Sequence, residues 1–181
     1  MTDFNELPEL ATSLGAFKAS AISVDQISFD ATLRKACEVN YCGNYGKNWM
    51  CPPDIGGIDD LIESAKRYKY ALVFQTVSNL LDSFDVEGME EALRKHREVT
   101  AKIGEALRQR GCGDMLELSA GGCTLCQPCA KRTGEPCRHP GQAVPSLEAY
   151  GMYVAKMASL CGMNYINGKN TVTYFGAFLV K

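Results

Sequence analysis

The chain has 181 residues, of which 46% are hydrophobic, so it can form one domain with an ordinary apolar core and needs no disulfide staples. The formal net charge is -2 and the acidic residues are dispersed, which argues against a nucleic-acid partner and against an acidic tail. No stretch approaches the about 20 consecutive apolar residues that span a bilayer, and the first residues lack the basic and apolar segments of a secretory signal. We therefore expect a cytoplasmic protein with no membrane partner.

The first third of the chain predicts a lead-in, a strand, two helices and a long loop. Residues 1–15 mix apolar and polar side chains and contain a proline, so we expect weak structure there. Alternation of apolar and polar residues over 19–27 predicts a strand, and 29–36 has the pattern of a short helix that delivers the first cysteine at its end. The glycine, asparagine and aromatic residues of 40–57 indicate a functional loop, and an apolar face over 58–68 predicts a second helix.

The rest of the chain alternates strands with helices. A nearly continuous apolar run over 70–77 predicts a buried central strand, and the longest helical pattern extends over 85–110. Residues 115–119 predict a short strand, 146–160 a helix, and 172–180 one or two closing strands that follow an Asn-Gly turn. This alternation predicts an α/β fold with a mixed sheet flanked by helices.

The nine cysteines are distributed unevenly along the chain. Thiols in the cytoplasm stay reduced, so grouped cysteines point to metal binding or catalysis rather than to disulfides. The first group consists of Cys37, Cys42 and Cys51. The second group consists of Cys123, Cys126, Cys129 and Cys137. We therefore expect residues 1–181 to form a single α/β domain with a cysteine-rich, cluster-binding loop insertion and with metal-binding loops at 37–53 and 121–141.

The second group has the more specific spacing. Two residues lie between Cys123 and Cys126, and two between Cys126 and Cys129. This spacing lets three thiolates converge on one face of a cubic cluster, and it matches the first three ligands of a bacterial ferredoxin run. Cys137 lies eight residues further on and offers a fourth thiolate. His139 is either a ligand, a hydrogen-bond donor to a ligand, or an exposed side chain. The spacing predicts a [4Fe–4S] cluster. Zinc is the alternative, and the spacing favours it less because zinc sites usually combine two separate Cys-x2-Cys pairs.

The first group, Cys37-x4-Cys42-x8-Cys51, has one ligand fewer than the usual four. Three thiolates suffice to hold a cluster with one open iron, where a substrate can bind. The same cysteines can instead complete a single site with the second group, bind a separate metal, or include a reactive thiol. Cys112 either supplies the fourth ligand or marks a helix end, and Cys161 lies on an apolar helix face and is expected in the core.

Six segments of the chain together contain the cysteines of both groups. They are Arg34-Lys-Ala-Cys37, Cys42-Gly-Asn-Tyr45-Gly-Lys, Trp49-Met-Cys51-Pro52-Pro53, Cys123-Thr-Leu-Cys126-Gln-Pro-Cys129, Pro136-Cys137-Arg138-His-Pro140 and Pro145-Ser146-Leu-Glu148-Ala-Tyr-Gly151. From about residue 20 onward the chain resembles the predicted metal-binding proteins gathered as domain of unknown function 2284. The resemblance implies a small cytoplasmic protein of anaerobic bacteria and archaea with an iron–sulfur centre, and it implies no particular reaction. It carries over the metal ligands Cys37, Cys42, Cys51, Cys123, Cys126, Cys129 and Cys137.

Three functions are compatible with these features. The first is an iron–sulfur protein with one [4Fe–4S] cluster, or with two, that serves electron transfer or redox metabolism in anaerobes. Its partner is then a redox protein or a small-molecule substrate, and a homodimer is left open. The second function is an enzyme that uses an open cluster iron at the three-cysteine group, and the third is a zinc-binding structural or interaction module. The chain contains no Gly-x-Gly-x-x-Gly or Walker motif, so a nucleotide cofactor is unsupported.

Overall fold

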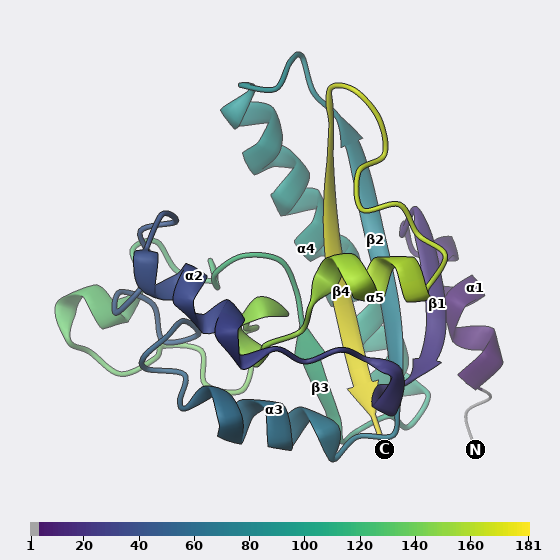
Figure 1. Ribbon diagram of the computed structural model, residues 1–181, viewed down its shortest axis with the longest axis horizontal. Coiled ribbons are helices and arrows are strands. Elements are labelled where there is room, and N and C mark those ends of the chain that lie inside the picture. The colour runs from purple at the N-terminus through teal and green to yellow at the C-terminus, as the bar shows by residue number, and fades with distance from the viewer. Residues whose placement is uncertain (1–3) are drawn as a thin grey trace.

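A four-stranded sheet organises the chain in the computed structural model, which describes residues 4–181 (Figure 1). Its strands are β1 (Lys18–Ser23), β2 (Tyr70–Asn79), β3 (Met115–Leu118) and β4 (Thr171–Val180), in the spatial order β1-β2-β4-β3. The two central strands, β2 and β4, pair along all ten residues of each. The predicted strand 172–180 is therefore one strand, β4, and the α/β prediction is confirmed.

The ladders between these strands are antiparallel, whereas the alternation of strands and helices predicts a mixed sheet. Strands β2 and β3 do run in the same direction, and α4 connects them as a crossover helix, as the alternation suggests. The last strand, β4, inserts between them and runs antiparallel to both. An insertion of this kind depends on pairing between distant segments and leaves no local pattern in the sequence.

Helices cover both faces of the sheet (Figure 1). One face packs against α1 (Leu7–Ser13) and α4 (Val86–Gln109), and the other against α3 (Ile58–Lys66) and α5 (Val154–Leu160). The short helix α2 (Arg34–Val39) lies beside the cysteine-bearing segments. Within residues 4–181, no helix combines the length and the apolar character needed to cross a bilayer.

Strand β2 shows how one strand serves two apolar cores. Leu72 and Phe74 are fully buried against α1 and α4, while Ala71 and Val73 are fully buried against the layer that contains α3 and α5. Successive side chains of a strand point to opposite faces, so a strand covered on both sides becomes a continuous apolar run. This is why the pattern over residues 70–77 predicts a buried central strand correctly.

The expectation of weak structure over residues 1–15 is wrong for the part that the structure describes. Phe4–Glu6 forms a 3-10 turn and Leu7–Ser13 forms α1, and residues 1–3 lie outside the described residues. Leu7 and Ala11, four residues apart, are fully buried against the sheet. Helices this short are not stable alone and form because their apolar face is packed, so composition gives little warning of them.

The helix predicted over residues 146–160 is interrupted. A 3-10 turn spans Glu148–Tyr150, Gly151 adopts a left-handed conformation with a φ of 69°, and Met152 forms an isolated bridge with Phe29 before α5 begins. A Cβ on Gly151 would lie 3.0 Å from Cδ1 of Ile62, so glycine permits both the turn and the close approach of α3. The strand predicted over 19–27 likewise ends early, because a 3-10 turn follows β1.

Gly176 allows the central strands to pair under the ring of Phe74, and we predict that replacing it destabilises the fold. An added Cβ would overlap the ring, at 2.6 Å from Cε1 of Phe74. Gly176→Ala should lower the free energy of unfolding by about 1–3 kcal/mol, as overpacking does in cores. Denaturant unfolding measures the change. The control is Gly113→Ala, where an added Cβ meets no atom within 4 Å; equal stability of both variants would contradict the prediction.

Candidate metal centre

The two cysteine-bearing segments come together on one side of the molecule. Figure 1 shows the loop that follows α2 and the long segment that follows β3 lying beside each other, away from α1 and β1. The first loop starts where Asn40 ends α2 in a left-handed conformation with a φ of 59°. Cys37 lies within α2 rather than after it, because the helix predicted over residues 29–36 is shifted toward the C-terminus.

Side-chain hydrogen bonds join the two segments. The amide Nδ2 of Asn48 donates to the backbone oxygen of Cys123 over 2.7 Å, and Nε1 of Trp49 donates to the backbone oxygen of Glu135 over 2.9 Å. Asn48 is only 4% exposed, and its Oδ1 also accepts from the backbone N–H of Met50. The first loop is therefore anchored to the second at both ends of the second cysteine group.

Lys131 adds a charged connection between the segments. Its Nζ forms an ion pair with Asp54 and lies 4.3 Å from the centre of the Trp49 ring. The lysine and the aspartate are both largely shielded from solvent. A shielded pair of this kind is less screened than one on the open surface, so it contributes to holding the loops together.

The backbone of the second segment approaches the first group closely at Gly122. A Cβ built on this glycine would lie 3.3 Å from Sγ of Cys51, 3.3 Å from Nδ2 of Asn44 and 3.4 Å from Nδ2 of Asn48. These distances are shorter than ordinary carbon contacts. The absence of a side chain at position 122 therefore sets how near the two cysteine groups can lie.

The thiols of both groups influence one another electrostatically. Burial raises the pKa of the Cys51 thiol to about 12, and the neighbouring thiols of Cys42, Cys37, Cys123 and Cys129 add to the rise. Thiolates crowded in this way repel each other unless a cation balances them, and a metal does so by displacing their protons. The structure therefore brings members of the two groups into one electrostatic neighbourhood, as a shared or adjacent metal centre requires.

An open hollow of about 480 Å³ lies beside the second group. Its wall contains Cys123, Cys126 and Cys129 on one segment and Asn44 and Asn48 on the other. The soft thiolate donors match the preference of iron–sulfur clusters and zinc rather than that of magnesium or calcium. The donor set thus fits the predicted centre.

No three side chains of His, Cys, Asp or Glu among residues 4–181 lie close enough to hold a single metal ion. A four-iron cluster differs from one ion in this respect, because each thiolate binds a different iron atom and the ligands are spread around the cube. The metal ligand assignments for Cys37, Cys42, Cys51, Cys123, Cys126, Cys129 and Cys137 stay predictions.

The other cysteines and both histidines lie in different surroundings. Cys161 packs against the core beside α5, as its helical pattern predicts, and Cys112 packs beside α1 and α4, so it is not grouped with the first set. His139 is half-buried next to the second group. His96 is fully buried between α4 and the sheet, with its Nδ1 2.9 Å from Oγ1 of Thr76. It is a core residue.

Residues outside the cysteine pattern complete this region, and the sequence gives little sign of them. Asn48 is one of several asparagines in a loop, where such residues usually support turns. Arg97 lies on α4, and its guanidinium donates to the backbone oxygen of Gly122 over 2.6 Å and to the hydroxyl of Thr124. Both residues act across long sequence separations, so their role becomes visible only in the folded chain.

Comparison with known protein families gives one match. The family described as predicted metal-binding protein, domain of unknown function 2284, matches residues 20–180. The chain belongs to this family. The matched residues include every cysteine of both groups. No curated protein and no solved structure matches the chain.

We predict that Asn48 supports metal binding without being a ligand. Asn48→Ala removes the hydrogen bond to Cys123 and loosens the contact between the loops. Supporting residues of this kind typically change metal affinity by about 10–100-fold, and we expect a loss in that range. Competition with a chelator under anaerobic conditions measures it. Asn167→Ala is the matched control, because Asn167 makes two side-chain hydrogen bonds in the segment before β4; an equal loss there would refute the assignment.

We also predict a contribution of His96 to stability that depends on pH. Burial lowers the pKa of His96 from 6.5 to about 4, so the native state resists protonation that the unfolded state accepts. The free energy of unfolding should therefore fall by up to about 3 kcal/mol from this residue as the pH drops from 6.5 to 4. Denaturant titrations at several pH values should show a shallower fall for His96→Leu. Identical slopes for the two proteins would contradict the prediction.

Proposed function

We propose that this chain binds a [4Fe–4S] cluster through Cys123, Cys126, Cys129 and Cys137. The observation that carries the proposal is the hollow of about 480 Å³ whose wall contains the first three of these cysteines. The Cys-x2-Cys-x2-Cys spacing supports a cubic cluster rather than a tetrahedral zinc ion, because three thiolates at successive x2 spacing suit three corners of a cube. Zinc remains the alternative metal.

The surroundings of Cys123 support a thiolate ligand. Burial raises the pKa of its thiol, and the backbone N–H groups of Leu125 and Val144 counter that rise by donating toward the sulfur. Backbone donors around cysteine sulfurs stabilise their negative charge and tune the potential of a bound cluster. In the proposed site, the chain supplies thiolates, amide donors and a partly closed wall, and the cluster supplies one-electron redox capacity.

A role in electron transfer or redox metabolism follows from that capacity. Arg132 lines the hollow, and Arg138, which pairs with Glu135, also interacts electrostatically with Cys126 and Cys129. These positive side chains offset part of the negative charge that four thiolates bring. A redox protein or a small molecule is the partner that such a centre serves, in the cytoplasm of an anaerobe.

A second candidate function concerns the first group. Cys42 is exposed, whereas Cys37 and Cys51 are half-buried, so these three thiols form a set with one side open to solvent. A cluster held by three thiolates leaves one iron without a protein ligand, and such an iron can bind a substrate. The proposed enzyme would use Cys37, Cys42 and Cys51 for this purpose.

We predict that Cys126→Ala removes iron. If each group holds a cluster, the iron content should fall from about eight to about four atoms per chain, and if the groups share one cluster, it should fall from about four toward zero. The loop should also lose stability, because metal binding and local folding are coupled. Anaerobic purification followed by iron, sulfide and zinc analysis and by absorption near ~400 nm measures these outcomes.

The matched control is Cys161→Ala, which removes a core thiol outside both groups and should leave iron and colour unchanged. Unchanged iron in Cys126→Ala would refute the ligand assignment. A colourless wild-type protein with stoichiometric zinc would refute the iron–sulfur proposal. For the open-iron candidate, addition of cyanide should change the spectrum of the wild-type protein and not that of Cys42→Ala.

A further inference from the structure

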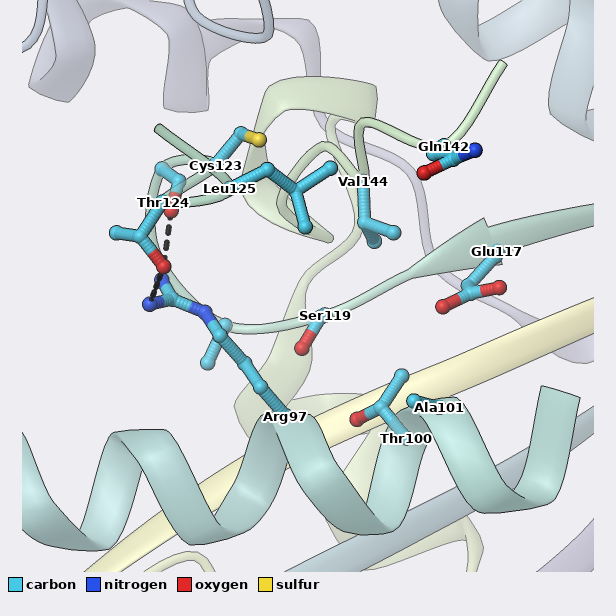
Figure 2. Close-up of a pocket in the computed structure, with 12 residues that line it drawn as sticks. Arg97, Thr100, Ala101, Glu117, Ser119, Cys123, Thr124, Leu125, Gln142 and Val144 are labelled. Atoms are coloured by element: carbon cyan, nitrogen blue, oxygen red, sulfur yellow. Dashed lines mark hydrogen bonds between the residues drawn. The ribbon is translucent and has the colours of Figure 1, made fainter. Parts of the chain in front are cut away.

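A separate cavity of about 130 Å³ lies between α4 and the segment that follows β3 (Figure 2). Helix α4 supplies one wall, the end of β3 supplies the floor, and the second cysteine segment closes the cavity above. The residues that line it include Arg97, Thr100, Ser119, Leu125, Val144 and Cys123. Since Cys123 is part of the wall, a molecule bound here would lie next to the proposed metal ligand.

Arg97 gives the cavity an available positive charge. Its guanidinium is half-buried and donates to the backbone oxygen of Gly122 and to the hydroxyl of Thr124. It forms no ion pair with an Asp or Glu of residues 4–181. A guanidinium carries five N–H donors, so these two bonds leave three for another acceptor. Arginine N–H groups form charge-assisted hydrogen bonds to carboxylate oxygens.

Ser119 provides a second, independent sign of a ligand. The residue is 5% exposed, and its backbone N–H and oxygen are bonded to Pro145 and Leu147. Its hydroxyl is buried and has no hydrogen-bond partner among the described residues. Figure 2 shows this hydroxyl directed toward α4, between Arg97 and Thr100. Nearly all buried polar groups have a partner, so a hydroxyl that lacks one in the wall of a cavity is where a ligand supplies the missing bond.

The size and the remaining walls limit what can bind. A volume of about 130 Å³ holds roughly four water molecules, which excludes nucleotides and other large anions. Leu125 and Val144 add apolar surface opposite Arg97 (Figure 2). Glu117 also lines the cavity, but its carboxylate is paired with Arg108 over 3.3 Å. One available cation and an apolar wall suit a singly charged acid with a short carbon chain better than phosphate, which carries more charge and no apolar part.

We propose that this cavity binds a small carboxylate anion, with its two oxygens on Arg97 and Ser119 and its carbon chain against Leu125 and Val144. The binding residues belong to the chain itself and do not depend on which metal the cysteines hold. Because Arg97 also holds Gly122 and Thr124 on either side of Cys123, an anion on its guanidinium would act directly beside the metal centre.

Calorimetric titration of the anaerobically purified, metal-loaded protein with propionate tests this proposal. Propionate should bind saturably, and its neutral isostere propionamide should bind at least tenfold more weakly because it lacks the charge that Arg97 recognises. Inorganic phosphate should also bind at least tenfold more weakly. Arg97→Gln should weaken propionate binding at least tenfold, while Arg97→Lys should recover part of the affinity. Metal content is measured on every sample, so failure of the carboxylate site is distinguished from failure of the iron–sulfur proposal.

A second variant covers the case in which Arg97→Gln disturbs the cysteine segment. Ala101→Phe fills the mouth of the cavity from α4 without touching the bonds of Arg97, and it should abolish propionate binding with the metal content unchanged. The matched control is Ala155→Phe, at a position on α5 outside this cavity, which should bind propionate like the wild type. Absence of propionate binding to the wild type, equal affinity for propionamide, tighter binding of phosphate, or wild-type affinity in Ala101→Phe would each overturn the proposal.

Discussion

The ten-residue ladder between β2 and β4 is the interaction on which the rest of the structure depends. It joins a strand from the middle of the chain to the last strand, so the sheet is complete only when both are in place. Both strands are buried on two faces, and each face then holds its own set of helices. The position of α4 on one face fixes Arg97, and the position of β3 beside β4 fixes where the second cysteine segment starts. The two cysteine groups therefore lie on segments that leave a rigid scaffold.

Crowding of thiols is the main electrostatic feature of the loops. Each of these thiols disfavours the ionisation of the next, so their thiolate form is costly without a cation nearby. The contacts of Asn48, Trp49 and Lys131 nevertheless hold them there. Such an arrangement is favourable when a metal supplies the balancing charge, and it fits the membership of the chain in a family of predicted metal-binding proteins.

Local patterns in the sequence predict the elements that bury a large apolar surface, and they fail where a distant contact decides the structure. Strand β2 and helix α4 follow from an apolar run and a long periodic face. Helix α1 escapes prediction because seven residues carry too little pattern, and Gly151 interrupts a helix whose periodicity continues on both sides. The cysteine groups are visible from spacing alone. Asn48 and Arg97 are not, because their partners lie 75 and 25 residues away.

Because 75 positions separate Asn48 from Cys123 along the chain, the two cysteine groups are synthesised at different times. During synthesis the first cysteine group leaves the ribosome long before the second, and the strand that completes the sheet comes last of all. A metal delivered early would meet three thiols on an unanchored loop, with no opposing wall and no balancing side chains. For the proposed centre, this order favours loading after translation, because the closing strand sets the spacing between the two cysteine groups. The order of the chain thus makes the meeting of the two cysteine groups a late event in folding.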